Sequence, residues 1–327
     1  MAVLSVVVPV RDVEPYVGTT LASLHRNVRT VADAGHRVEV VVVDDGSVDG
    51  TGERVAQALP GLPGAVVLRN EVPRGLAAAR NQGAAAASGR WLAYLDGDDW
   101  LAPHHLRTMV EALEHLRCDL VRVDHVRVQG GSRTVHRAPE GRRGVVFDPR
   151  SAILPAGADT LVDYPYAWAG AYDVRLRDEG LLHFPEHLLT AEDRSVVWGL
   201  HLRARSCAVL SSTGIFYRRG LPGSLTQVGD ARQLHFLDAY ELVLRDVAAD
   251  RDADRLLPKA VQQLVALVLH HVGQEQRLEP ALRRELRRRC ADALARLPGD
   301  LLVQAQRRLA PHRSAALAGL LPAPAAA

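Results

Sequence analysis

Three carboxylates lie within four residues of the stretch Arg90–Trp100, which reads R-W-L-A-Y-L-D-G-D-D-W. Asp96, Asp98 and Asp99 follow the short apolar run Trp91–Leu95, which has the composition of a buried strand. Carboxylates this close repel one another, and a hard divalent cation relieves the repulsion. Mg²⁺ or Mn²⁺ held by one or two carboxylates usually completes its shell with substrate phosphates. The cluster therefore favours a metal site for a phosphorylated ligand, with a solvated Asp-Gly turn as the equally simple alternative.

A second acidic turn, Asp44–Thr51, follows the β-branched run Val38–Val43. Similar apolar runs at Val3–Val8 and Val66–Leu68, with helical patterns between them, predict an α/β fold with a parallel sheet and right-handed crossovers. Pro9 is expected to end the first strand. The carboxyl ends of parallel strands meet at one edge, so both acidic turns are expected there. No G-x-G-x-x-G or G-x-x-x-x-G-K-[ST] motif occurs at the required position, which argues against dinucleotide enzymes and P-loop NTPases.

Composition limits the class of protein further. The 327 residues include 40 Lys and Arg and 38 Asp and Glu, and the formal net charge of +2 gives no reason to expect nucleic acid as a partner. Three widely spaced cysteines fit a reducing compartment and not a disulfide framework. The apolar N-terminus lacks the features of a signal peptide, and the apolar runs are too short to cross a bilayer. We therefore expect a cytoplasmic protein, and a position at the inner face of the membrane stays open.

Four motifs follow one another in the N-terminal part of the chain: Ser5–Val10, Val41–Thr51, Gly75–Gly83 and Tyr94–Trp100. Together and in this order they resemble the motifs of family 2 glycosyltransferases with the GT-A fold. The resemblance implies a Rossmann-like, mostly parallel sheet flanked by helices, and an inverting transferase that uses Mn²⁺ or Mg²⁺. It also implies a nucleotide-diphosphate sugar as donor, with a UDP-sugar as first choice. The expected acceptor is a hydroxyl-bearing glycan, a polyol-phosphate or a lipid-linked acceptor in cell-envelope or other glycoconjugate synthesis.

The resemblance also assigns roles to residues of these motifs. Asp98 would ligate the metal, and Asp96 would contact the metal and the ribose or sugar. The pair Arg11-Asp12 departs from the family's usual Tyr-Asn or Arg-Asn, so a carboxylate stands where an amide is common. Without the flanking motifs Arg80 is a surface helix residue and Asn70 a turn former, and Arg74 is an alternative phosphate contact. The remaining donor-binding residues implied here are Pro9, Arg11, Asp44, Asp45, Asn70 and Arg80.

The segment Thr190–Arg194, T-A-E-D-R, precedes the apolar helical stretch Ser195–Leu202. A threonine cap with acids in the first turn is ordinary chemistry for a helix start and is worth about 1 kcal/mol. Its place in the chain nevertheless matches the Glu-Asp motif of the resembled family, whose Asp acts as general base. Such a group is required because an acceptor hydroxyl is a poor nucleophile until a carboxylate within about 3 Å takes its proton. We assign Asp193 as the base and Glu192 as an acceptor-orienting neighbour.

A basic segment, Ile215–Thr226, resembles the family's Tyr-Arg…Gly-Ser lid over the diphosphate, which implies that Arg218, Arg219 and Ser224 bind the donor. Arginine forks suit phosphate oxygens and would stabilise a leaving diphosphate. The alternative is that the two arginines belong to a solvated turn.

The middle of the chain is expected to face the acceptor. Residues 119–128 alternate as one strand, and residues 130–150 indicate a loop and hairpin. The aromatic segment Tyr164–Tyr172 would stack on sugar rings or fill the core. We place Trp168 on the acceptor side, because the resembled family often has a Trp-Gly-like segment there.

From Ala231 onward leucines recur at helical spacing, which predicts a helical region 231–327 appended to a catalytic domain 1–230. The stretch Arg277–Arg289 forms a basic amphipathic helix. A solvated face on a helix that packs against the catalytic domain or a second subunit is favoured, and peripheral membrane contact and a homo-oligomer stay open.

The sequence therefore predicts an inverting, metal-dependent glycosyltransferase. A metal on Asp98, together with Arg218 or Arg219, would take the charge of the leaving diphosphate. Two alternatives remain. One is a sugar nucleotidyltransferase, whose usual Gly-rich basic loop is not visible after the first strand, and the other is a catalytically silent nucleotide-sugar-binding module.

Overall fold

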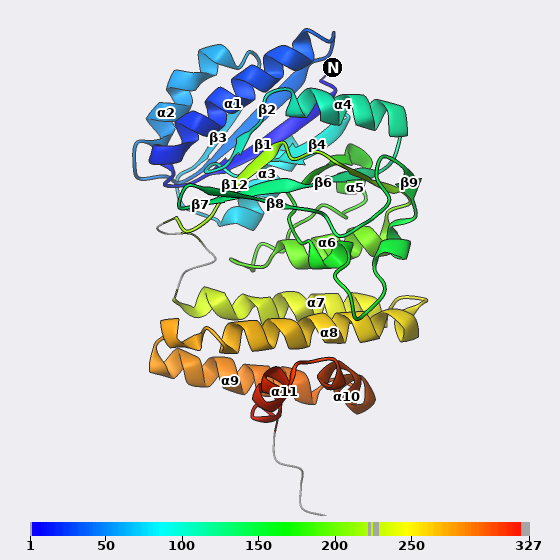
Figure 1. The fold of residues 1–327 in the computed structure, drawn as a ribbon. Coiled ribbons are helices and arrows are strands. Elements are labelled where there is room, and N and C mark those ends of the chain that lie inside the picture. Colours follow the sequence, from blue (N-terminus) through cyan, green and yellow to red (C-terminus); the bar gives the residue numbers. More distant parts are fainter. Residues whose placement is uncertain (1, 222–223, 225–228, 322–327) are drawn as a thin grey trace, which may run out of the picture.

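The computed structural model describes residues 2–221, 224 and 229–321. These residues form a large and a small β-sheet covered by helices, with a further stack of helices at one end (Figure 1). The large sheet has the order β3-β2-β1-β4-β10-β6-β11-β9 and the small sheet the order β5-β12-β7-β8. The strands are β1 (Leu4–Val10), β2 (Val38–Asp45), β3 (Val66–Asn70), β4 (Trp91–Tyr94), β5 (Trp100–Leu101), β6 (Leu120–Val123), β7 (His125–Gln129), β8 (Ser132–His136), β9 (Val146–Phe147), β10 (Gly170–Asp173), β11 (Cys207–Leu210) and β12 (Ile215–Arg218). The helices are α1 (Glu14–Ala32), α2 (Thr51–Ala58), α3 (Leu76–Ala86), α4 (His105–Leu116), α5 (Val174–Asp178), α6 (Asp193–Arg203), α7 (His235–Ala248), α8 (Ala253–Val272), α9 (Pro280–Ala295), α10 (Gly299–Arg307) and α11 (Pro311–Ala318).

The large sheet is mostly parallel, as predicted. β1 pairs in parallel with both β2 and β4, β2 pairs in parallel with β3, and β10 runs antiparallel between β4 and β6. All seven residues of β1 are buried, because α1, α2 and α4 lie above the sheet and α3 and α6 below it in Figure 1. A strand covered on both faces favours the continuous valine runs seen in the sequence. The predicted α/β architecture with helices on both faces is confirmed.

Pro9 does not end the first strand, because β1 continues to Val10 and Pro9 pairs with Val43 of β2. The physical reason lies in the neighbouring strand. Pairing between β1 and β4 ends at Val7 and Tyr94, and the Val7 carbonyl accepts the last bond, from Leu95 N. Residues two apart in a strand point the same way, so the nitrogen of Pro9 faces the side where β4 has already ended. The missing N–H of Pro9 therefore removes no hydrogen bond between strands.

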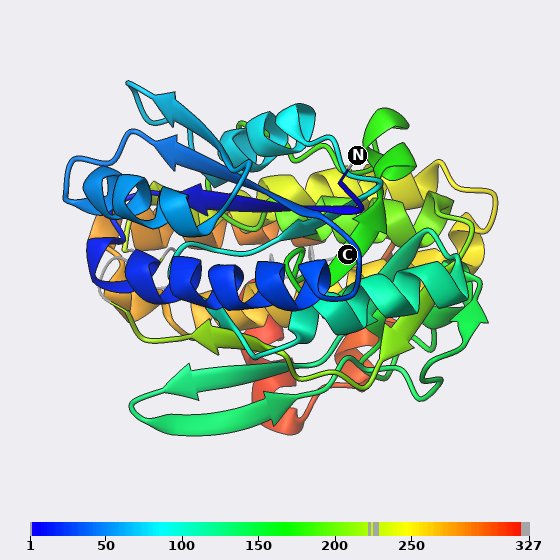
Figure 2. The ribbon, with the colours of Figure 1, turned by 90° about the horizontal axis from the view of Figure 1, so that it is seen from above.

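The prediction of one strand over residues 119–128 was wrong. The chain breaks at Asp124, so β6 belongs to the large sheet and β7 to the small one. Asp124 is buried, and its Oδ1 accepts hydrogen bonds from Ala138 N at 2.8 Å and from Arg143 at 2.8 Å. A buried carboxylate needs such hydrogen-bond partners. Because the partners of Asp124 lie outside the large sheet, the chain leaves that sheet at this residue. In Figure 2 the hairpin of β7 and β8 lies apart from β1–β3, on the other side of α1.

Helix α1 carries a polar stripe that faces inward. Thr20, Ser23 and Asn27 are fully buried and are spaced three and four residues apart, so they share one face of the helix. Thr20 Oγ1 donates to the carbonyls of Gly97 and Asp99, and Ser23 Oγ accepts from Leu101 N. Asn27 donates to the Ala102 carbonyl and accepts from Leu106 N. The stripe therefore fixes the backbone of the acidic turn at residues 96–99 and of the chain that leaves it.

The C-terminal helices stack below α6 in Figure 1, with α7 between α6 and α8. Their hydrophobic core includes Trp198 and Leu202 of α6, so it continues into the region that carries the sheets. The single lysine of the chain, Lys259 on α8, is buried, donates to the Ala158 carbonyl and pairs with Asp163. Gln263, one turn later, also donates to Asp163. Within residues 2–221, 224 and 229–321, no helix combines the length and the apolar character needed to span a bilayer.

We predict that Lys259→Met lowers the free energy of unfolding by about 3 kcal/mol, because it leaves the Asp163 carboxylate without its buried cation. Urea denaturation measures this change. Arg255→Gln, an exposed change on the same helix, is the matched control and should alter stability by less than about 0.5 kcal/mol. Equal stability of Lys259→Met and the natural chain would show that the pair does not hold the helices in place.

Candidate active site

Asp45, at the end of β2, organises the entry to α3. Its carboxylate accepts hydrogen bonds from Asn70 Nδ2 at 2.8 Å, Arg74 N at 2.9 Å and Gly75 N at 2.8 Å. Gly75 has φ +99°, a conformation that favours glycine, and α3 begins at the next residue. The Asp45 carboxylate thus sets where α3 starts.

Asp44, the neighbour of Asp45, is also buried and already has protein partners. Its Oδ2 pairs with Arg69 at 2.5 Å, and its Oδ1 accepts from Ser47 N at 2.9 Å. Both predicted donor-binding residues, Asp44 and Asp45, therefore lie at the carboxyl edge of the sheet, where their carboxylates hold the turns that follow β2 and β3. Pro9 lies beside them at the end of β1, pairing with Val43.

Arg80 connects the two acidic motifs that the sequence singled out. It comes from α3, is only 2% exposed, and donates to Asp96 at 2.8 Å and to Glu192 at 2.7 Å. The ring of Phe184 lies 5.3 Å from its guanidinium carbon. Burial alone lowers the pKa of Arg80, but the charges of Asp96 and Glu192 outweigh it and raise the pKa above its usual value. The alternative of a surface helix residue is wrong for Arg80.

The acidic turn after β4 holds three carboxylates in different environments. Burial, and then the charge of Asp96, raise the pKa of Asp98 to about 6. Burial, followed by the charges of Asp98 and Asp96, raises the pKa of Asp99 well above its usual range. Asp99 Oδ1 accepts from Arg218 N at 2.7 Å, whereas its buried Oδ2 has no partner among the described residues. Negative charge at this turn is therefore only partly compensated by protein groups.

A divalent cation fits this turn. Asp96 gives one oxygen to Arg80, and the Asp98 side chain makes no ion pair with any described residue. Among the described residues, no group of three or more His, Cys, Asp or Glu side chains is placed to hold an ion. An ion at Asp98 and Asp96 would therefore share its shell with oxygens of another molecule, which is the usual arrangement for Mg²⁺ with substrate phosphates.

Arg218 and Arg219, both predicted to bind the donor, are directed to different places. Arg218 donates to the Asp98 carbonyl at 2.8 Å and stacks on Trp100, with 4.3 Å between its guanidinium carbon and the ring centre. Arg219 instead donates to Tyr217 Oη at 3.0 Å. Successive side chains of a strand point to opposite faces, which separates the two guanidiniums. Only Arg218 lies at the acidic turn.

Asp193 begins α6 directly after Glu192, and the preceding Ala191 has φ +60°. Burial, and then the charge of Glu192, raise the pKa of Asp193 to about 7. Glu192 is buried against Arg80, so its carboxylate holds the loop in place. Asp96 is among the charges that act on Asp193. The acidic turn at Asp96–Asp99 and the pair Glu192–Asp193, distant in sequence, therefore share one site. The reaction predicted from the sequence requires this proximity, because the base and the diphosphate site act on the same sugar.

Aromatic rings adjoin Asp193. Trp168 is buried, and it packs on Tyr166 with 4.9 Å between ring centres and on Tyr217 at the same distance. Tyr166 and Tyr217 are half-buried, and the Asp193 charge acts on Tyr166. Trp168 thus supports the two tyrosines from behind. The close spacing of aromatic residues in Tyr164–Tyr172 indicated that rings gather here, but it did not indicate which ring is accessible.

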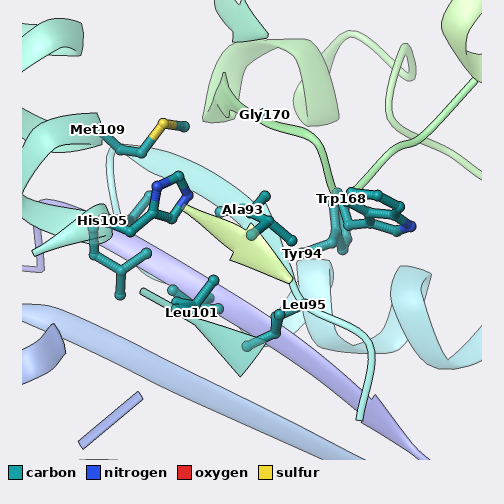
Figure 3. Close-up of a pocket in the computed structure, with 12 residues that line it drawn as sticks. Ala93, Tyr94, Leu95, Leu101, His105, Met109, Trp168 and Gly170 are labelled. Carbon is teal, nitrogen blue, oxygen red and sulfur yellow. The ribbon is translucent and has the colours of Figure 1, made fainter. Parts of the chain in front are cut away.

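Trp168 also lines a small internal cavity of about 10 Å³ beside β4 and α4, together with His105 and Met109 (Figure 3). Such a volume holds about one water molecule. Burial lowers the pKa of His105 to about 4, so its ring is neutral near pH 7. Its lining also includes Leu95 and Leu101, which flank the acidic turn, so the cavity is a packing feature of the core beside that turn.

Two predicted residues lie at the margin of the site. The Arg11 side chain is 51% exposed, and its nearest carboxylate, Asp12, is 3.6 Å away. Ser224 donates its backbone N–H to the Leu221 carbonyl. The rest of the predicted lid, residues 222–223 and 225–226, lies outside the described residues. Sequence reasoning did not single out the polar stripe of α1 or Tyr166. The spacing of Thr20, Ser23 and Asn27, three and four residues apart, was a signal that could have indicated the stripe.

Residues 5–167 match the family model described as glycosyl transferase family 2. The chain belongs to this family. The match ends before Glu192 and Asp193, so the assignment of the base depends on the geometry described above.

A curated relative agrees with this family assignment. The succinoglycan biosynthesis protein ExoO of Rhizobium meliloti is 31% identical over 237 residues, which cover 69% of this chain and 65% of ExoO. The chain spans less than two thirds of the length of the curated relatives it matches.

Solved structures at low identity share the fold. Residues 1–349 of Staphylococcus aureus TarS in complex with UDP-GlcNAc give a TM-score of 0.72 at 20% identity, covering 96% of this chain and 88% of that one. The mannosyltransferase PcManGT of Pyrobaculum calidifontis, in complex with GDP-Man and Mn²⁺, gives 0.54 at 18% identity, covering 97% and 78%. At 96% and 97% of this chain, both matches extend over the helical C-terminal region as well as the sheets.

We predict that Arg80→Gln lowers the free energy of unfolding by about 3–5 kcal/mol, because it leaves the buried Glu192 and the half-buried Asp96 carboxylates without their shared cation. The control is Arg107→Gln, which breaks an exposed i,i+4 pair with Glu111 and should cost less than about 0.5 kcal/mol. Chemical denaturation of both variants measures the difference. Similar losses in the two variants would contradict the linking role of Arg80.

We also predict a pH-dependent effect of Asp193→Asn on stability. The pKa of Asp193 is raised to about 7 in the folded state, so folding binds a proton and this stabilisation is lost as pH rises through about 7. At about pH 8 the Asn variant should therefore be more stable than the natural chain by about 1–3 kcal/mol, and the advantage should disappear near pH 4. Denaturation curves across this range test the sign. If the stability advantage of the Asn variant instead grew toward low pH, the pKa of Asp193 could not be raised in the folded state.

Proposed function

We propose that this protein transfers a sugar from a UDP-sugar to a hydroxyl of its acceptor with inversion at the anomeric carbon. The observation that supports it best is the Arg80 bridge, because it sets Asp193 beside the acidic turn at Asp96 and Asp98. A transferase needs a base and a diphosphate site on the two sides of one sugar. Family membership and the shared fold with UDP-GlcNAc-bound TarS support the donor class.

In this proposal Asp193 takes the proton of the acceptor hydroxyl, and the oxygen attacks the anomeric carbon from the face opposite the diphosphate. Glu192 and Arg80 hold the base in position. Asp98 and Asp96 would hold Mn²⁺ or Mg²⁺, which when bound neutralises charge on the leaving diphosphate. Arg218, whose guanidinium donates to the Asp98 carbonyl, would bind oxygens of the same diphosphate. The half-buried Tyr166 and Tyr217 offer ring faces to the acceptor, with Trp168 behind them.

The proposal extends to domain roles and location. Residues 1–230 would form the catalytic domain and residues 231–327 a helical region that supports α6. The three cysteines are buried free thiols, which fits the reducing cytoplasm. The acceptor would be a glycan, a polyol-phosphate or a lipid-linked precursor of a cell-envelope or related polysaccharide.

We expect Asp193→Asn to lower the turnover of UDP-sugar by about 10²–10⁴-fold, the usual contribution of a general base. Its affinity for UDP with Mn²⁺, measured by calorimetry, should stay within about twofold. Asp98→Ala should instead weaken Mn²⁺-dependent UDP binding. Asp178→Asn, which changes an exposed carboxylate, serves as control for both assays.

The outcomes distinguish the proposed function from its alternatives. Full activity of Asp193→Asn would remove Asp193 as base. UDP-sugar binding without turnover, across a panel of donors and acceptors, would favour a silent binding module. Consumption of a nucleoside triphosphate and a sugar phosphate would favour a nucleotidyltransferase.

A further inference from the structure

One face of the small sheet carries a row of apolar side chains. Phe216 of β12 pairs with Trp100 of β5 on one side and with Val126 of β7 on the other, and Val126 pairs with Val135 of β8. Paired residues of neighbouring strands point to the same face of a sheet, so the four side chains form one row across it. We call Trp100, Phe216, Val126 and Val135 the apolar row.

The apolar row reaches solvent toward the edge of the sheet. Val135 is 51% exposed, and Trp100 and Phe216 are half-buried. β8 is the outermost strand of the small sheet, and the hairpin of β7 and β8 extends to the lower margin of the molecule in Figure 2. The apolar row therefore ends on an open surface and does not continue into the core.

Two exposed arginines border the apolar row. Arg133 lies two residues before Val135 on β8 and so on the same face, and its guanidinium carbon is 5.4 Å from the centre of the Phe216 ring. Arg137 follows directly after β8. Within the described part of the chain, neither Arg133 nor Arg137 has a carboxylate oxygen within 4.0 Å. Both cations are therefore available to a partner.

Negative charge is missing from the small sheet. None of the strands β5, β7, β8 and β12 contains Asp or Glu, and residues 125–137 include three arginines and no acid. The chain as a whole, by contrast, has 40 basic and 38 acidic residues. Farther along, Arg142 and Arg143 already pair with Glu140 and Asp124. A surface with free cations and no acids favours an anionic partner.

The aromatic rings of the row have no free face for stacking. Trp100 and Phe216 stack on each other, with 5.0 Å between ring centres and 6° between ring planes. Arg133 lies over Phe216, and Arg218 lies over Trp100 at 4.3 Å. Binding of a nucleic-acid strand or a glycan by aromatic side chains needs open ring faces. An anionic membrane instead offers phosphates to the arginines and, below them, an interfacial layer that accepts apolar and aromatic side chains.

We propose that this face of the small sheet binds the surface of an anionic membrane through Arg133, Arg137 and the apolar row. The inference goes beyond the proposed function and does not depend on it, because lipid binding needs neither donor nor acceptor. Arg218 is not counted among the lipid contacts, since it donates to the Asp98 carbonyl. Its place two residues after Phe216 on β12 nevertheless sets the acidic turn close to the bound surface.

Co-sedimentation of the full chain with vesicles tests the proposal. Vesicles of phosphatidylcholine alone are compared with an equal mixture of phosphatidylglycerol and phosphatidylcholine. We expect at least about tenfold tighter binding to the anionic vesicles, and a loss of this preference as the salt concentration rises. Arg133→Gln combined with Arg137→Gln should weaken binding to the anionic vesicles by about tenfold. Val135→Gln, which removes an exposed apolar contact, should weaken it by about threefold.

A matched double variant separates this face from the charge of the protein in general. Arg26→Gln combined with Arg29→Gln removes two exposed arginines of α1 that form no ion pair with any described residue, and vesicle binding should stay within about twofold. UDP affinity, measured without vesicles, tests the proposed function alone, so either proposal can fail without the other.

Three results would overturn the membrane proposal. The first is equal binding to neutral and anionic vesicles. The second is an equal loss of binding in the hairpin double variant and the α1 double variant. The third is a dimer in solution that Val135→Gln dissociates, without vesicle binding by the natural chain, because it would assign the face to a second copy of the protein.

Discussion

The buried guanidinium of Arg80 is the interaction on which the site depends. It lies between Asp96, at the end of β4, and Glu192, at the start of α6, and these two carboxylates are far apart in sequence. A buried charge is tolerated only when it is paired and hydrogen-bonded, so the arginine and the two acids each require the others. Because Arg80 sits on α3, whose start is set by the Asp45 carboxylate, the first acidic turn controls the position of the other two.

Polar side chains of α1 also fix the backbone of the acidic turn that follows β4. Thr20 on α1 donates to the Gly97 and Asp99 carbonyls, and Ser23 and Asn27 hold the chain that follows, so the acidic turn keeps its backbone conformation despite the repulsion between its carboxylates. Such sites store unfavourable electrostatic energy that a bound cation or a proton can release. The raised pKa values of Asp98 and Asp193 express this energy. Stability elsewhere, chiefly the valine-rich sheet and the leucine-rich helices, offsets it.

The C-terminal helices are joined to the region that carries the sheets. Their core continues into α6 through Trp198 and Leu202, and the buried pair of Lys259 and Asp163 connects α8 to the sheet-bearing region. Helix α7 packs against α6 on one side and against α8 on the other. A helical region that looked like an appendage in the sequence thus packs directly against α6, the helix that begins at Asp193.

The sequence by itself determined the α/β class, the parallel strands and the acidic turns that follow them, because buried strands leave runs of valine and strand ends leave Asp and Gly at fixed offsets. Family motifs pointed to Asp98 and Asp193 as well. Only the tertiary structure decided that Arg80 is buried, that Arg218 and Arg219 diverge, and that residues 119–128 divide between two sheets at Asp124. These features depend on which distant groups meet in space, and local spacing carries no record of a partner a hundred residues away.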